Sequence, residues 1–87
     1  MSVHKAITKL TKKHNEIASQ FATLEQQREV FISEAIHLCQ QNKSFTTNKI
    51  NSITNEMNEL AKSGVVPQRK LVSEEMVKEY VGRLNQS

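Results

Sequence analysis

The sequence contains no aspartate and no tryptophan, and only one cysteine, one proline and two glycines among its 87 residues. A single cysteine excludes an internal disulfide bond. No apolar run approaches the ~18 residues of a membrane-spanning helix. No charged-then-apolar leader with a small-residue cleavage site is recognisable either. We therefore expect a cytoplasmic protein that does not enter a membrane.

The scarcity of glycine and proline, together with abundant glutamate, lysine, glutamine, alanine and leucine, favours helices over strands. We expect an all-α fold without a sheet. A chain of this length forms one domain, residues 1–87, and buries only ~60–65% of the surface of its unfolded state. Its stability is then small unless a partner or very regular helix packing adds to it.

The N-terminal part of the chain carries an apolar heptad pattern. Only His14 and Arg28 interrupt an alternating spacing of four and three residues that joins Val3, Ile7, Leu10, Ile17, Phe21, Leu24, Phe31, Ala35 and Leu38. Such a repeat indicates a helix that lies against another helix. No glycine or proline interrupts it, so we expect one helix over about residues 3–41, ~55 Å long at ~1.5 Å per residue.

The apolar stripe widens along this helix. In the first half only the heptad positions are apolar, which is typical of a coiled-coil seam, whereas Ile32, Ile36 and Cys39 broaden it in the second half. The two halves should therefore have different neighbours.

A second helix is expected over about residues 47–63. Thr46 is the predicted N-cap, and Phe45 would then form a hydrophobic staple with Ile50. Beside its apolar stripe this segment carries a stripe of asparagines, which are poor helix formers, so the helix must depend on tertiary contacts. These are Asn48, Asn51, Asn55 and Asn58.

Gly64 gives the strongest local end signal, because a glycine with positive φ followed by Pro67 is typical of a Schellman-type helix terminus. A loop over residues 65–72 should be held by its apolar ends while its basic middle faces water. Ser73 then caps a third helix over about residues 74–85, whose buried face is predicted to comprise Met76, Val77, Tyr80, Val81 and Leu84. Both short helices should pack on the wide half of the long helix around Phe31, Ile36, Ile53, Met57, Val77 and Tyr80.

Lysines gather at the start of the long helix. Residues 1–15 carry four lysines and no acid, whereas residues 16–42 carry four glutamates and one arginine. This distribution opposes the helix macrodipole, and no requirement of folding explains it. The lysines form either a solvated face or a site for an anionic partner. The candidate residues for such a partner are Lys5, Lys9, Lys12, Lys13, Arg69 and Lys70.

Two short helices cannot cover the whole long helix, so the narrow seam of its first half should stay bare in a monomer. We therefore predict a homodimer through Val3, Ile7, Leu10, His14, Ile17 and Phe21. An antiparallel pair is favoured, since a parallel pair would bring the lysines of both copies together. The competing geometry extends the third helix along this half and gives a long monomer.

No catalytic or ligand-binding constellation is recognisable. His37 and Cys39 lie two residues apart on a helix and point ~200° apart, so they cannot hold one metal ion. Cys39 is more simply a small core residue. No Glu-x-x-His motif, glycine-rich phosphate loop or nucleophile elbow occurs. We expect no enzyme, no metal, no cofactor and no small-molecule substrate.

Two stretches, Leu24-Glu-Gln-Gln-Arg-Glu through Glu34-Ala and Asn58-Glu-Leu-Ala-Lys-Ser-Gly through Tyr80, resemble a family of small uncharacterised proteins from Bacillus-type bacteria. The resemblance implies a bacterial, cytoplasmic, helical protein and brings no activity with it.

Two functions from different classes remain. The first is a structural or regulatory module that associates with itself or with another helical protein. The alternative is an accessory nucleic-acid-binding protein whose N-terminal lysines contact phosphates. Against the alternative, the basic stretch lacks the arginine and aromatic side chains that base recognition commonly uses.

Overall fold

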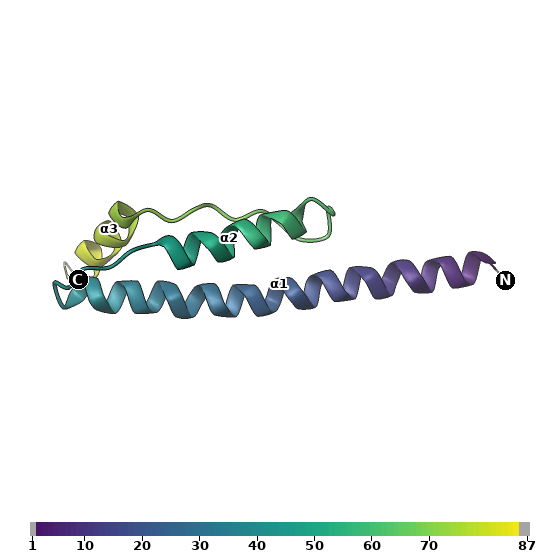
Figure 1. Ribbon diagram of the computed structural model, residues 1–87, viewed down its shortest axis with the longest axis horizontal. Coiled ribbons are helices and arrows are strands. Elements are labelled where there is room, and N and C mark those ends of the chain that lie inside the picture. The colour runs from purple at the N-terminus through teal and green to yellow at the C-terminus, as the bar shows by residue number, and fades with distance from the viewer. Residues whose placement is uncertain (1, 86–87) are drawn as a thin grey trace.

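The computed structural model describes the backbone of residues 2–85 and the side chains of residues 11–85. Over that range the chain forms three helices and no strand: α1 (Ser2–Gln40), α2 (Asn48–Ala61) and α3 (Glu74–Asn85). Helix α2 lies along the C-terminal half of α1, and α3 packs close to the C-terminal end of α1 (Figure 1). The predicted all-α fold of one long and two shorter helices is confirmed.

The molecule is elongated because of α1. Its principal extents are 62 × 25 × 16 Å, and its radius of gyration is 17.6 Å, against ~12 Å for a compact domain of this length. Helix α1 has 39 residues and therefore spans ~58 Å at ~1.5 Å per residue. Its N-terminal part extends well beyond α2 and α3 (Figure 1).

Helix α1 ends in a Schellman motif built on an asparagine. Asn42 has a φ of 58°, and its N–H donates to the carbonyl of Cys39 at 3.1 Å, while the N–H of Lys43 donates to the carbonyl of Leu38 at 2.9 Å. These two bonds and the left-handed residue between them define the motif. The sequence pattern missed it, since asparagine tolerates this conformation but signals it less strongly than glycine does.

The end of α2 differs from its prediction. Gly64 has the expected positive φ, 81°, but it lies beyond the C-cap residue Lys62 and not directly after the helix. The N–H groups of Lys62, Ser63 and Gly64 donate to carbonyls three residues earlier, at 3.2, 3.1 and 3.1 Å. A Schellman turn at Gly64 was therefore a wrong prediction, because the chain tightens into 3₁₀-type bonds first.

Of the two predicted N-caps, that of α3 is confirmed and that of α2 is wrong by one residue. Thr47, and not Thr46, is the N-cap of α2, and it makes no side-chain cap hydrogen bond. Its hydroxyl instead accepts a long hydrogen bond, 3.4 Å, from the amide of Asn51. Ser73 caps α3 as predicted, since its hydroxyl accepts the N–H of Met76 at 3.2 Å.

The core lies on the C-terminal half of α1, where α2 and α3 each pack against it. Ala35, Ile50 and Val77 form its buried centre, and further apolar side chains pack around them: Phe31, Ile32, Ile36, Cys39, Phe45 and Val72. Cys39 is thus the small core residue that the sequence predicted, and Phe45 packs here although the cap has moved by one residue.

Helix α3 buries a narrower face than predicted. Val77 and Val81 are buried, whereas Tyr80 is 50% exposed, and Met76 and Leu84 are exposed as well. Residues four apart form a single stripe, which is all that contact with one neighbouring helix needs. The prediction that Tyr80 belongs to the core was wrong because α3 packs on α1 alone among the described helices.

Candidate interaction surface

The extended segment between α2 and α3 is held by two asparagine side chains of α2. The amide of Asn51 donates to the carbonyl of Val72 at 2.9 Å and accepts its N–H at 2.7 Å. Asn58 makes the same pair of bonds with Arg69, at 3.1 and 2.8 Å. The asparagines lie seven residues apart on a helix, ~10 Å, which matches the ~10 Å spanned by three extended residues.

Arg28 of α1 connects this helix to α2 and to the extended segment between α2 and α3. Its Nε donates to the hydroxyl of Thr54 at 2.8 Å, and its Nη2 donates to the carbonyl of Lys70 at 2.9 Å. Thr54 is fully buried, and its hydroxyl donates in turn to the carbonyl of Ile50 at 2.8 Å. A polar residue at a heptad position therefore fixes the register of α1 against α2.

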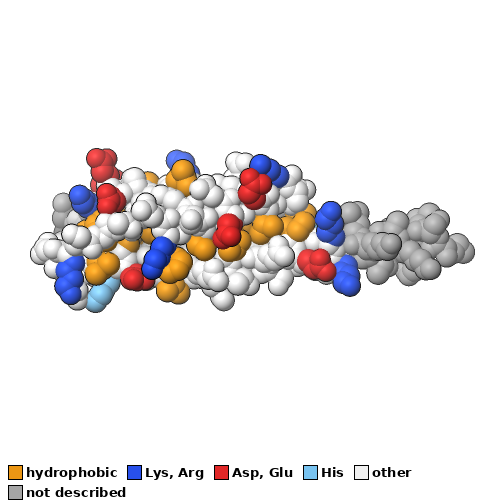
Figure 2. Space-filling view, viewed as in Figure 1, with side chains coloured by type: hydrophobic (Ala, Val, Ile, Leu, Met, Phe, Trp, Pro, Cys, Tyr) orange, Lys and Arg blue, Asp and Glu red, His pale blue; other side chains and the backbone are white. Residues whose placement is uncertain are grey.

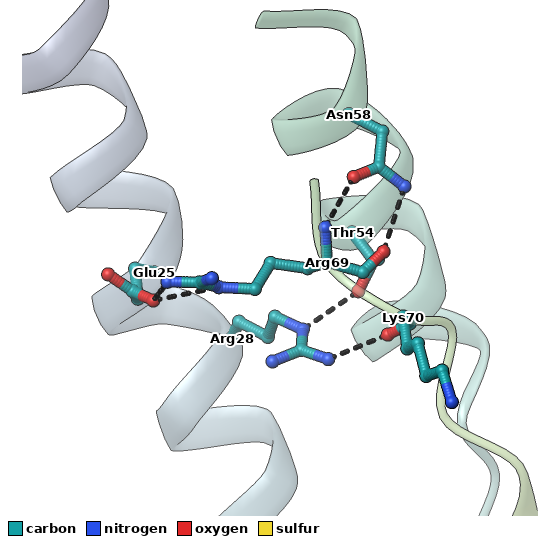
Figure 3. A network of polar contacts seen from close by, with 6 residues as sticks. All are labelled: Glu25, Arg28, Thr54, Asn58, Arg69 and Lys70. Atoms are coloured by element: carbon teal, nitrogen blue, oxygen red, sulfur yellow. Dashed lines mark hydrogen bonds and ion pairs between the residues drawn. The ribbon is translucent and has the colours of Figure 1, made fainter. Parts of the chain in front are cut away.

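Arg69 completes this polar network (Figure 3). Its Nη2 lies 2.7 Å and its Nε 3.2 Å from one carboxylate oxygen of Glu25, with both side chains about one-third exposed. The guanidinium also lies over the ring of Phe21, 5.3 Å from its centroid. Arg69 thus attaches the extended segment to α1 at the point where α2 ends.

The predicted dimer seam is shortened by this contact. Phe21 is only 7% exposed, so it belongs to the folded chain and is not available to a partner. Ile17 is half-buried and His14 is exposed. Val3, Ile7 and Leu10 lie within α1, but their side chains are outside the described residues. The part of the seam left for a partner is therefore Val3 to Ile17.

The predicted cationic residues separate into two groups. Lys12, Lys13 and Lys70 are exposed, and Lys5 and Lys9 lie outside the residues whose side chains are described. Arg69 is engaged with Glu25 within the chain. It is therefore not a free cation for an anionic partner.

Two open grooves lie along the part of α1 that packs against α2 and α3. One, of about 490 Å³, lies between α1 and α3 and is lined by Ile32, Ile36, Met76 and Tyr80 among others. The other, of about 420 Å³, lies between α1 and the last turns of α2; its lining residues are Ser19, Gln20, Thr23, Leu24, Glu56 and Leu60. Figure 2 shows apolar side chains along the boundary of the helices, and charged side chains of both signs where the uncovered part of α1 begins.

In residues 11–85 no three histidine, cysteine or acidic side chains come together as a metal site would require. His37 interacts with the side-chain amide of Gln41 at 3.0 Å, one turn along the exposed face of α1. Among the residues that the structure describes, no helix has the length and apolar character to cross a bilayer.

Comparison with known proteins assigns the chain to a protein family. Residues 1–83 match the family model described as "Protein of unknown function (DUF2533)". The chain belongs to the DUF2533 family. It is 50% identical over 82 residues to the "Uncharacterized protein YpbS" of Bacillus subtilis (strain 168), and the match covers 94% of this chain and 96% of that protein. No solved structure matches. The resemblance to a small, uncharacterised bacterial family is therefore confirmed.

Sequence patterns missed how this DUF2533 chain fixes its extended segment. Arg69 and Glu25 are 44 residues apart, and no local spacing connects them. The asparagine stripe of α2 was the available signal: its members weaken the helix in isolation, so two of them have their role in bonds to the segment that follows.

Proposed function

We propose that this protein is a non-enzymatic helical interaction module that forms a homodimer through the N-terminal half of α1. The supporting observation is that α2 and α3 pack on the C-terminal half of α1, so that the first turns of α1 have no neighbour in the described chain (Figure 1). Side chains 11–20 are all exposed except Ile17. The seam that a partner would cover comprises Val3, Ile7, Leu10, His14 and Ile17.

Energetics favour covering this seam. Each copy would bury four apolar side chains, and each of these contributes ~1.5–3 kcal/mol to the free energy of association on full burial. This gain is set against ~4–15 kcal/mol of lost translational and rotational freedom. The balance is a modest one, so we expect a dimer that dissociates in the micromolar range. A helix of about 19 residues without tertiary contacts is itself marginal in water. Dimerisation should therefore raise the helicity of the N-terminal half.

Charge favours the antiparallel arrangement. We place Val3 opposite Ile17 of the second copy, so that the residue numbers of two facing positions sum to about 20. Lys5 of each copy then lies near Glu16 of the other copy, at both ends of the seam. Glu16 has no ion-pair partner among the side chains that the structure describes. A parallel pair would instead align four lysines with the same four lysines.

Light scattering coupled to size exclusion, at tens of micromolar, tests the dimer. We expect a dimer mass for the wild type and a monomer mass for Leu10→Glu. Leu71→Glu is the matched control, because Leu71 is 54% exposed on the extended segment and should leave the dimer intact. A wild type of monomer mass, or a Leu10→Glu variant that still dimerises, would refute the seam as the interface.

A further inference from the structure

We infer that α3 provides a second contact between copies of this chain. In this contact one side of α3, formed by Met76, Tyr80 and Leu84 and called here the α3 edge, packs antiparallel against the α3 edge of another copy. Helix α3 lies close to the C-terminal end of α1, whereas the proposed seam lies in the N-terminal half of α1 (Figure 1). The contact therefore goes beyond the homodimer proposed above and does not depend on it.

The α3 edge carries apolar surface that contact with α1 does not cover. Met76, Tyr80 and Leu84 are 45%, 50% and 42% exposed, and their spacing of four residues places them on one side of the helix. Met76 and Tyr80 also line the groove of about 490 Å³ between α1 and α3, which Ile32 and Ile36 of α1 line as well. A helix packed on the α3 edge would close this groove and remove apolar surface of both helices from water.

The charges beside the α3 edge favour a second copy as the occupant. At ~100° per residue, Glu79 and Arg83 lie to the same side of Tyr80, about 100° and 60° around the helix. Both are exposed, and neither has an ion-pair partner among the described residues. When a two-fold axis relates two antiparallel helices, the same flank of each helix faces the other. Glu79 of each copy then approaches Arg83 of the other, and one contact forms two ion pairs.

The register follows when the two-fold axis passes beside Tyr80. The two Tyr80 side chains face each other, and Met76 of each copy lies opposite Leu84 of the other. Glu79 and the Arg83 with which it pairs are then offset by ~3 Å along the helix axes, which side chains of this length can span. A parallel pair would instead align Glu79 with Glu79 and Arg83 with Arg83, so charge favours the antiparallel arrangement.

The contact is small and should be weaker than the seam. Each copy contributes three apolar side chains that are already about half covered, and interfaces of this size belong to the weak, transient class. We expect a dissociation constant of ~1 mM. The α3 contact should therefore be dissociated at tens of micromolar and form only where the protein is concentrated. Because α3 lies far from the seam, the contact would join homodimers end to end.

Cross-linking tests the contact in the absence of the seam. A chain with Leu10→Glu and Cys39→Ala receives Tyr80→Cys, is concentrated to ~1 mM and is treated briefly with a short bis-maleimide. We expect a covalent dimer on a denaturing gel, because residue 80 of each copy faces residue 80 of the other. Lys78→Cys in the same background is the matched control. Lys78 is also exposed but lies ~160° around the helix from Tyr80, so this variant should stay monomeric.

Charge reversal separates the proposed pairing from unspecific contact between apolar side chains. In the Tyr80→Cys chain, Glu79→Lys should lower the yield of covalent dimer about fivefold, because two ion pairs become two repulsions. Adding Arg83→Glu should restore the yield. Glu56→Lys makes the same change at an exposed position of α2 and should leave the yield unchanged. Circular dichroism at 222 nm verifies that each variant keeps its helical content.

Two results would overturn the α3 contact. One is a Tyr80→Cys chain that cross-links no better than the Lys78→Cys chain, and the other is an effect of Glu79→Lys no larger than that of Glu56→Lys. Neither result bears on the seam, because Leu10→Glu removes the seam from this experiment. A wild type of monomer mass at tens of micromolar would conversely refute the seam and leave the α3 prediction in force.

Discussion

Replacing Asn51 by alanine measures how much the extended segment contributes to stability. The change removes both hydrogen bonds to Val72, each with a net value of ~0.5–1.5 kcal/mol. It also leaves a half-buried N–H and carbonyl without these partners. Alanine returns up to ~0.7 kcal/mol of helix propensity. Partial burial lets water replace some of the loss, so we expect the free energy of unfolding to fall by ~1–2 kcal/mol.

Asn55 offers a matched control on the same helix. Its side chain is exposed and has no hydrogen-bond partner among the described residues, so Asn55→Ala should raise stability by up to ~0.7 kcal/mol through propensity alone. Urea unfolding followed by circular dichroism at 222 nm measures both variants. A difference of less than ~0.5 kcal/mol between them would show that the bonds to Val72 do not stabilise the fold.

Hydrogen exchange supplies a local test of the same bonds. The N–H groups of Arg69 and Val72 donate to asparagine oxygens, whereas those of Lys70 and Leu71 have no acceptor within the described part of the chain. We expect slow exchange at the first two and fast exchange at the second two. Asn51→Ala should accelerate exchange at Val72 first. Equal rates at all four positions would contradict the pairing.

Other perturbations probe the turn, the core, the arginine bridge and the lysines. Gly64→Ala should cost ~1 kcal/mol and Gly64→Asn less, because only φ and no neighbouring atom opposes a side chain there; alanine equal to glycine in urea unfolding would contradict this. Ile50→Ala should cost ~2–5 kcal/mol and Phe31→Ala less, since Ile50 is 1% exposed and Phe31 is half-buried; the reverse order would place the core elsewhere. Arg28→Met should lower thermal stability by ~4–8 °C through the loss of ~1 kcal/mol of bonds to Thr54 and the extended segment; an unchanged melting temperature would show that the bridge is dispensable. A pool of DNA and RNA should show no retardation at physiological salt; retardation at low salt that falls steeply as salt rises would favour the nucleic-acid alternative.

The helices could be predicted from the sequence because their signals are local. A heptad repeat without glycine or proline defines α1, and Ser73 with Glu74 and Glu75 behind it defines the start of α3. The start of α2 moved by one residue because threonines at 46 and 47 are equivalent as caps in sequence. Only their packing separates them, since Thr47 is buried.

The faces that each helix buries were harder to predict. Periodicity gives α3 two adjacent apolar stripes, one with Val77 and Val81 and the other with Met76 and Tyr80. Which stripe is buried depends on the number of neighbours, and α3 has only α1. The apolar pattern of one helix cannot report that number.

The extended segment was predicted least well because polar contacts, and not apolar ones, hold it. Leu71 is exposed, whereas the backbone of its neighbours is bound by Asn51, Asn58 and Arg28. Side-chain amides reach any backbone group within a few ångströms, so the sequence spacing of such pairs carries no periodic signal.

The polar contacts that hold the extended segment also explain why α1 has a covered and an uncovered part. The segment after α2 turns back at Gly64 and is attached to α1 through Arg69 and Glu25, directly over Phe21. In the described chain no other segment lies beside the first turns of α1 (Figure 1). Because these polar contacts fix where the covering ends, the heptad repeat that continues from Ile17 toward Val3 is left largely without a neighbour in the described part of the chain. A second helix packed on these residues would account for the repeat, and the proposed homodimer would supply that helix.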